Sequence, residues 1–298
     1  MSLDKIVAIV NPVAGKGKCA RLWPEIDRYL RELGLSFDVR FTEKKGDATR
    51  IASEASAQGA TGLLAVGGDG TLHEVVNGNL EHPVTVGVVP AGSGNDFIRS
   101  FGLKPDDWRS ACQIIARGQA QPMDLGQING RHFINVAGVG FDAAVANCAN
   151  IWAKDRFPGS LAYIAALLKT IIEFKPTEVT VELDDQTFCA KGWLVAVANA
   201  QYFGGGMWVA PQARIDDGLF DVCILGELSK PGLLKAFPSV FTGKHLQHPA
   251  IHYYRSRTVK VSTRDPLLVQ ADGELIGRTP QVFQLRPHRM MIFGAGGK

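Results

Sequence analysis

The first 120 residues alternate between short apolar runs and segments with apolar residues at helical spacing. The apolar runs are rich in β-branched residues and predict buried strands at 5–10, 36–42, 62–66 and 85–89. The amphipathic segments predict helices at 21–33, 47–58, 71–77 and 108–117. Regular alternation of strand and helix predicts a doubly wound, mostly parallel sheet.

The pattern changes after Pro122. Residues 123–128 and 131–136 read as strands joined by Asn129-Gly130, a dipeptide typical of a tight hairpin. Further short strands are predicted at 178–183, 193–198, 220–225, 258–262, 267–271 and 282–285. Many short strands with few helices favour an antiparallel β-sandwich or barrel.

Two helices interrupt these strands. The segment 161–174 has a broad apolar stripe and a candidate N-cap at Ser160, and it is either a core-packing helix or a flap over an apolar cleft. A short surface helix is predicted at 231–241. We expect an α/β domain at 1–121, to which residues 288–298 return, and a β-rich domain at 122–287.

Composition narrows the class of protein. A length of 298 residues favours two domains, and a net charge of +3 does not indicate a nucleic-acid partner. The five cysteines form no CxxC pair, which predicts reduced thiols in a cytoplasmic protein. The sequence starts with a strand-like segment instead of a signal peptide, and no apolar run is long enough for a transmembrane segment.

Three glycine-rich loops follow predicted strands, at 11–18, 67–71 and 90–97. Ligands of parallel sheets bind beyond the carboxyl ends of the strands, so we expect the loops to gather at one edge. Glycine lets a phosphate approach the backbone N–H groups, and the N-terminus of the next helix adds further donors. Asp69 among these amides indicates a nearby cation such as Mg²⁺, or it stabilises the turn. Asp96 either joins it or caps a helix that begins at Phe97.

Two acidic turns in the second half carry candidate chemistry. Asp272-Gly273-Glu274 follows the strand at 267–271, and such a pair is commonly only a turn. Asp216-Asp217-Gly218 offers hard oxygen ligands for Mg²⁺, although acidic surface turns are usually just solvated.

Taken together, six blocks resemble the soluble bacterial diacylglycerol kinase and lipid kinase family. This family includes YegS-like and DgkB-like proteins and is related to eukaryotic sphingosine and diacylglycerol kinases. GGDGT alone would be weaker, because it also occurs in NAD kinases. The blocks, in chain order, are Asn11-Pro12 with Gly15; Gly67-Gly68-Asp69-Gly70-Thr71-Leu72 with Glu74; Pro90 to Phe97; Gly204-Gly205-Gly206-Met207 with Ala210-Pro211; Ile215-Asp216-Asp217-Gly218-Leu219; and Asp272-Gly273-Glu274.

The resemblance implies an NAD-kinase-like first domain that binds ATP, a structural Mg²⁺ site, and a general base in the acidic turn. The Mg²⁺ ligands would be Asp217 and the backbone carbonyls of Arg214 and Leu219. The catalytic residues would be Glu274, Asp272 and Asp69. Two positions depart from the common pattern, His73 in place of a frequent asparagine and Gly94 after Ser93. The implied ATP-binding residues are Asn11, Pro12, Val13, Ala14, Gly15, Thr42, Gly67, Gly68, Asp69, Gly70, Thr71, Leu72, His73, Glu74, Ser93 and Asn95.

We therefore expect an ATP- and Mg²⁺-dependent lipid kinase. It would transfer the γ-phosphate to a hydroxyl of diacylglycerol or a related lipid, in a cleft between the two domains. The lipid is presented at a membrane, so peripheral association with the inner membrane surface is expected, as a monomer or a homodimer. Basic residues near Tyr253-Tyr254 either help docking or are merely solvated. The alternatives are a kinase for a soluble acceptor such as NAD, or a nucleotide- and lipid-binding regulator without turnover.

Overall fold

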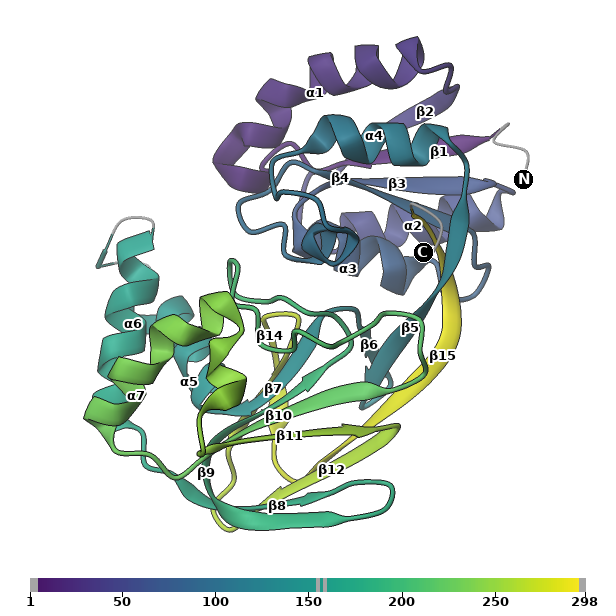
Figure 1. The fold of residues 1–298 in the computed structure, drawn as a ribbon. Helices are drawn as coiled ribbons and strands as arrows, with labels where there is room; N and C mark the ends of the chain where they lie inside the picture. Colours follow the sequence, from purple (N-terminus) through teal and green to yellow (C-terminus); the bar gives the residue numbers. More distant parts are fainter. Residues whose placement is uncertain (1–4, 154–155, 158–159, 295–298) are drawn as a thin grey trace. The chain divides into compact units, whose positions relative to one another are not determined.

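The computed structural model describes residues 5–153, 156–157 and 160–294, with the side chains of 160–164 outside the description. The chain forms two compact units (Figure 1). Unit 1 comprises Met1–Leu125, Ile215–Gly218 and Arg286–Lys298. Unit 2 comprises Gly126–Arg214 and Leu219–Leu285.

Unit 1 is built on a parallel sheet. Its strands are β1 (Ile6–Val10), β2 (Phe37–Phe41), β3 (Gly62–Gly67), β4 (Thr85–Pro90) and the last part of β15 (Gln281–Phe293), paired in the order β15-β4-β3-β1-β2. All of these pairs are parallel, and every residue of β1 and β3 is buried. Burial on both faces explains why these strands read as uninterrupted apolar runs.

Helices cover both faces of this sheet. Figure 1 shows α1 (Ala14–Glu32) and α4 (Trp108–Ala116) on one face, and α2 (Asp47–Ala57) and α3 (Asp69–Gly78) on the other. Helix α1 begins earlier than predicted, but Gly15, Lys16 and Gly17 have left-handed backbone angles. The regular helix therefore starts only after a turn, as the glycines suggest. A short 3₁₀ helix, η1 (Phe97–Phe101), follows β4.

Unit 2 consists mainly of antiparallel strands. Strand β9 pairs with three neighbours, β7, β8 and β10. Beyond β7 the sheet continues to β13 and then β14, beyond β8 it continues to β12 and then β15, and beyond β10 it ends at β11. The strands are β5 (Ala120–Ile128), β6 (Arg131–Phe133), β7 (Val136–Gly140), β8 (Thr177–Glu182), β9 (Thr187–Ala198), β10 (Phe220–Gly226), β11 (Ile251–Ser256), β12 (Thr258–Thr263), β13 (Leu268–Ala271) and β14 (Glu274–Arg278). Asn129 and Gly130, both at positive φ, form the predicted hairpin between β5 and β6.

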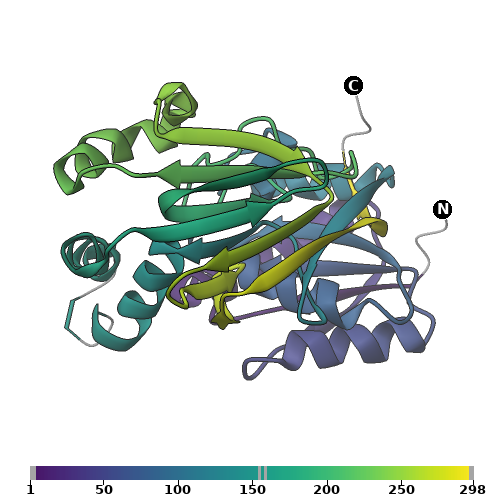
Figure 2. The ribbon, with the colours of Figure 1, turned by 90° about the horizontal axis from the view of Figure 1, so that it is seen from below.

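The helices of unit 2 lie at one end of its strands, as Figure 2 shows. They are α5 (Phe141–Cys148), the π-helical turn η2 (Ala149–Ala153), α6 (Ser160–Glu173), α7 (Lys230–Ala236), and the 3₁₀ helices η3 (Phe237–Thr242) and η4 (Lys244–Gln247). Helix α5 was not predicted, and the predicted helix at 231–241 changes to a 3₁₀ helix at Phe237. The predicted cap at Ser160 lies outside the described side chains.

The predicted fold class, an α/β half followed by an antiparallel β-sandwich half, is confirmed. Functional domain boundaries at 121/122 and 287/288 stay a prediction. In the part of the chain that the structure describes, none of the helices has the length and apolar character needed to cross a bilayer.

Candidate active site

The three glycine-rich loops of unit 1 touch at the level of their backbones. A Cβ atom on Gly92 would lie 2.4 Å from the Cα of Gly68, and one on Gly15 would lie 2.9 Å from the carbonyl oxygen of Ala91. Real Cβ atoms do not come this close to backbone atoms, so the loops meet only because these positions are glycine. The expected convergence of the loops at one edge of the sheet is therefore observed.

The side chains of two asparagines stabilise these loops by hydrogen bonds. Asn11 donates from Nδ2 to Thr71 Oγ1 at 3.0 Å, and Asn95 Oδ1 accepts from the backbone N–H of Gly92 at 3.0 Å. Oδ1 of Asn11 is buried and has no hydrogen-bond partner among the described residues. A buried acceptor left unpaired fits a ligand that can donate a hydrogen bond, such as the hydroxyl or amino group of a nucleotide.

Asp69 bridges two of the loops. Its Oδ2 and Oδ1 accept hydrogen bonds from the backbone N–H groups of Asp96 and Phe97, each at 3.0 Å. The Asp96 side chain does not cap η1, contrary to one of its two predicted roles, and its Oδ1 lies 3.4 Å from Arg99 Nε. A carboxylate held at a glycine loop has the hard oxygen donors that Mg²⁺ prefers.

The remaining residues implied for ATP differ in their surroundings. Glu74 accepts from the backbone N–H groups of Gly46 and Ala48, at 3.0 and 3.1 Å, and so satisfies the N-terminus of α2. Thr42 is buried and donates its backbone N–H to Val10. The structure leaves the roles of all these positions as predictions. Leu72 is buried, His73 is half-buried, and Val13, Gly70 and Ser93 are exposed positions of the three glycine-rich loops.

Asp124 on β5 is a site residue that the sequence-based prediction missed, and it is fully buried in unit 1. Its oxygens accept from the backbone N–H of Gly218 at 2.7 Å and of His288 at 2.6 Å. Burial raises the pKa of this carboxyl, these hydrogen bonds lower it, and the nearby charge of Asp217 raises it. Asp124 thus fixes the 215–218 segment that carries Asp217. A lone carboxylate in an apolar strand was the available signal. Arg214 and Leu219 belong to unit 2, and the predicted metal triad stays a prediction.

In unit 2, the predicted acidic turn joins β13 to β14. Asp272 and Gly273 have φ of 48° and 85°, which suits a tight hairpin turn. The carboxylate of Asp272 accepts from the backbone N–H groups of Ile134 and Asn135, at 2.8 and 2.9 Å, and of Val136 at 3.3 Å. Asp272 therefore ties the turn to the start of β7. Glu274 is the first residue of β14 and is half-buried.

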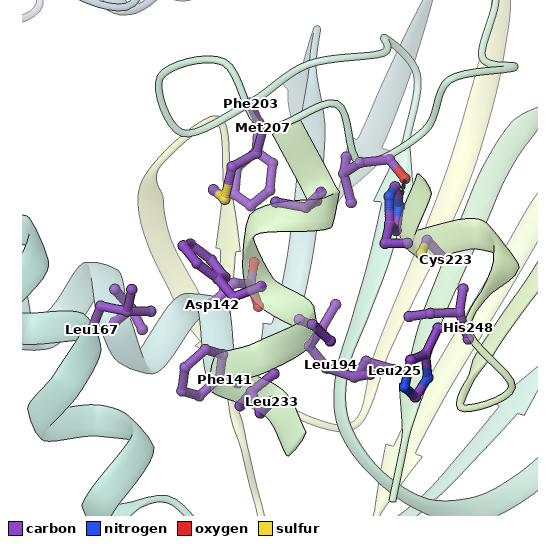
Figure 3. Close-up of a pocket in the computed structure, with 17 residues that line it drawn as sticks. Phe141, Asp142, Leu167, Leu194, Phe203, Met207, Cys223, Leu225, Leu233 and His248 are labelled. Carbon is purple, nitrogen blue, oxygen red and sulfur yellow. Dashed lines mark hydrogen bonds between the residues drawn. The ribbon is translucent and has the colours of Figure 1, made fainter. Parts of the chain in front are cut away.

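An apolar pocket lies in the same unit (Figure 3). The cavity has a volume of about 100 Å³ and opens to solvent. Phe203 and Met207 pair across the loop of Gly204, Gly205 and Gly206, so the predicted glycine loop positions two pocket-lining side chains. The wall is completed mainly by aliphatic and aromatic residues from α5, α6, β10 and α7, among them Phe141, Leu167, Leu225 and Leu233.

We expect the Gly92→Ala variant to be about 1–3 kcal/mol less stable than the wild type, because the added methyl group would overlap the backbone of Gly68. Gly70→Ala is the matched control, since a Cβ there meets nothing within 4 Å and alanine favours the helix. Urea unfolding of both variants measures the difference. Equal stabilities would show that the loops do not meet as described.

Comparisons with known proteins cover both units. The diacylglycerol kinase catalytic domain matches residues 5–128, and the YegS C-terminal NAD kinase beta sandwich-like domain matches residues 135–294. A curated diacylglycerol kinase from Bacillus subtilis is 32% identical to this chain, over 92% of this chain and 91% of its own length. One from Staphylococcus saprophyticus is also 32% identical, over 94% of this chain and 92% of its own length. A solved structure from Bacillus anthracis str. Sterne is similar over 99% of this chain and 97% of its own, with a TM-score of 0.82 and 27% identity.

Proposed function

Because this chain belongs to the diacylglycerol kinase family, we propose that it transfers the γ-phosphate of ATP, with Mg²⁺, to the hydroxyl group of diacylglycerol or a closely related lipid. The observation that carries the choice of acceptor is the apolar pocket of unit 2, which lies in the same unit as the Asp272-Gly273-Glu274 turn. A pocket lined by aliphatic and aromatic side chains suits acyl chains and offers little to a dinucleotide such as NAD.

On the donor side, the glycine loops would hold the phosphates through backbone N–H groups. The unpaired Oδ1 of Asn11 would accept a hydrogen bond from a ribose hydroxyl or the adenine amino group of ATP. Asp69 would hold the catalytic Mg²⁺, while Asp217 with the carbonyls of Arg214 and Leu219 would hold a structural Mg²⁺. Bound Mg²⁺ supplies the neutralisation of phosphate charge that phosphoryl transfer requires. Asp69 acts from a fixed position, because two backbone N–H groups already orient its carboxylate.

On the acceptor side, we assign the two carboxylates of the acidic turn different roles. Asp272 accepts hydrogen bonds from three backbone N–H groups, which fix the position of its carboxylate. It therefore positions the turn. Glu274 is the proposed general base that takes the proton of the lipid hydroxyl.

The direct test is transfer of labelled phosphate from ATP to a panel that includes diacylglycerol, monoacylglycerol, ceramide and sphingosine in mixed micelles, with NAD as the soluble acceptor. We expect diacylglycerol to be labelled with the highest kcat/KM. Labelled NAD would favour the soluble-acceptor kinase. Binding of ATP and lipid with no labelled product would favour the regulator without turnover.

We infer further that the enzyme meets the membrane through α6 and α7. Leu168, Ile172 and Leu234 are exposed at 46%, 71% and 45%, while Leu167 and Leu233, their neighbours in the chain, line the pocket. Lys230 Nζ on α7 donates to the backbone oxygen of Ile172, so the two helices are in contact. Exposed Lys175 and Lys235 suit an anionic lipid surface.

We expect the double variant Leu168→Ser/Ile172→Ser to lower activity on anionic vesicles about tenfold, because it loses roughly 1.4 kcal/mol of membrane contact. Activity on lipid dissolved in mixed micelles should stay within about twofold, since the pocket is unchanged. Val282→Ser replaces an equally exposed apolar residue on β15 and is the matched control. Equal losses on vesicles and micelles would contradict docking through this face.

A further inference from the structure

Among the described side chains that line the apolar pocket, one carries a carboxyl group, that of Asp142 in the first turn of α5 (Figure 3). Its Oδ2 accepts a hydrogen bond from Gln270 Nε2 at 3.0 Å. Its Oδ1 is buried and has no hydrogen-bond partner among the described residues. A buried carboxyl oxygen without a partner is costly, so its presence in a ligand pocket indicates a use.

The position of this carboxyl group is tightly fixed. The side chain lies on the backbone of Gly138 in β7, where a Cβ atom would come within 1.5 Å of Asp142 Oδ2. Only glycine at position 138 leaves room for it. The carboxyl group is therefore seated against the sheet at the pocket wall.

Gln270 links this group to the acidic turn. Its amide donates to Asp142 at one end, and at the other end its Oε1 accepts the backbone N–H of Gly273 at 2.8 Å. Gln270 is 2% exposed and lies opposite Gly138 in the ladder between β13 and β7. One buried amide thus connects the pocket carboxyl to the residue that precedes the proposed base.

The chemistry of the proposed lipid suggests what Asp142 contacts. Apart from the hydroxyl that reacts, diacylglycerol carries only ester oxygens, which accept hydrogen bonds and cannot donate them. A neutral carboxylic acid can donate. Burial raises the pKa of Asp142 to about 6, against the opposing hydrogen bond from Gln270, and a lipid that fills the pocket removes more water and favours the neutral acid further.

We propose, on the basis of the function above, that Asp142 donates a hydrogen bond to an ester carbonyl of bound diacylglycerol and so directs the reacting hydroxyl toward the acidic turn. Asp142 is a positioning and specificity residue. It makes the enzyme prefer lipids with ester-linked chains over lipids with ether-linked chains, because an ether linkage lacks the carbonyl oxygen that accepts this hydrogen bond.

Other ionisable groups lie near Asp142, and any pH experiment must distinguish their effects on KM from the effect of Asp142. Cys223, His245 and His248 also line the pocket, and burial lowers the pKa of His245. The remaining groups lie on α5 itself or on the elements packed against it: Cys148 on α5, Lys169 and Glu173 on α6, Cys189 and Lys191 on β9, and Glu274 and Arg278 on β14.

The first test compares a diacylglycerol with its dialkyl ether analogue in mixed micelles, for three proteins. For the wild type at pH 6 we expect KM to be about tenfold higher for the ether lipid, with kcat changed less, which matches the loss of one hydrogen bond. Asp142→Asn keeps a donor and should keep this preference. Asp142→Leu, of similar size without a donor, should treat the two lipids alike.

The second test is the pH dependence of KM for the ester lipid. The wild type donates only when Asp142 is protonated, so its KM should rise above pH 6 and level off about tenfold higher, the effect expected for loss of this one hydrogen bond. The asparagine amide does not titrate, so KM of Asp142→Asn should be flat over this range. Because histidine, cysteine and the remaining groups are unchanged in that variant, a pH effect that they cause would persist in it.

The melting temperature shows whether the variants are folded, and it also reports lipid binding in the absence of ATP. The folded protein holds a proton on Asp142 that the unfolded chain releases near its pKa of 3.8, so wild-type stability falls as the pH rises from about 4 to 6. Asp142→Asn should melt at a higher temperature than the wild type at pH 8 and close to it at pH 4. The ester lipid, without ATP, should raise Tm of the wild type at pH 6 more than the ether lipid does.

The outcomes separate the two proposals. A wild type that phosphorylates both lipids equally, with Asp142→Leu behaving the same, overturns the role of Asp142 and leaves the lipid kinase standing. A wild type that phosphorylates no lipid and shows no Tm difference between the two overturns both. Lost ester preference in Asp142→Leu with recovery in Asp142→Asn is the result that supports the inference.

Discussion

Replacing Glu274 by glutamine is expected to lower kcat for lipid phosphorylation by about 10²–10⁴-fold, the usual contribution of a general base. Glutamine has the same size and cannot take the proton of the lipid hydroxyl. KM for ATP and the melting temperature should stay near wild-type values, because the change removes a proton acceptor at a half-buried position. Steady-state kinetics and thermal unfolding of the purified variant measure both quantities.

Asp272→Asn is the matched control in the same turn. Its amide would direct N–H groups at the backbone donors of Ile134 and Asn135, so it should lose about 1–3 kcal/mol of stability. If Asp272→Asn instead inactivates the enzyme at wild-type stability while Glu274→Gln remains active, the two roles are reversed.

Asp69→Asn is expected to lower kcat by about 10²–10³-fold, as is typical when an electrostatic group at the reacting phosphate is removed. The concentration of Mg²⁺ that gives half-maximal activity should rise, because asparagine is a weaker ligand than a carboxylate. Titration of activity with Mg²⁺ at saturating lipid measures this shift.

Asp47→Asn separates the metal role of Asp69 from its structural one. Asp47 also accepts two backbone N–H groups in unit 1, from Glu43 and Lys44, at 2.9 and 3.0 Å. Those hydrogen bonds hold the pKa of Asp47 below its usual value, as expected for a carboxylate that stabilises a turn. If both variants lose stability and neither changes the Mg²⁺ requirement, Asp69 serves only to join the two loops.

The parallel half of the fold was predictable because its central strands, β1 and β3, are buried on both faces. Burial selects uninterrupted runs such as those of β1 and β3, and each run ends in a loop whose glycines are visible in the sequence. The gathering of the loops at one edge follows from the topology of parallel sheets, and their backbone contact requires glycine at positions 15 and 92.

Strand β7 and helix α5 were missed because their residues are small. Val136–Gly140 and Phe141–Cys148 are rich in alanine and glycine, and such residues carry weak hydrophobic periodicity. The α-helix predicted at 231–241 ends at Ala236, and a 3₁₀ helix continues from Phe237, because Pro238 in its first turn lacks the N–H that an α-helix needs.

The site residues that the sequence did not reveal depend on partners far along the chain. Asp142 gains its significance from Gln270, 128 positions away, and Asp124 from His288, 164 positions away. Each is an ordinary carboxylate by its neighbours in sequence. Local patterns therefore locate the glycine loops and the acidic turn, and only the three-dimensional structure shows which carboxylates are buried against them.

Unit 1 is assembled from segments that leave the ribosome at very different times. Its β4 edge pairs with the end of β15, where Ile292 lies beside Val86, and its 215–218 segment is held by Asp124. The parallel sheet of the nascent chain therefore stays incomplete, with its β4 edge unpaired, until nearly all of unit 2 has been translated. Shortening the chain before residue 286 would leave that edge bare and open to strand addition, which makes aggregation during synthesis the characteristic failure of C-terminal deletions.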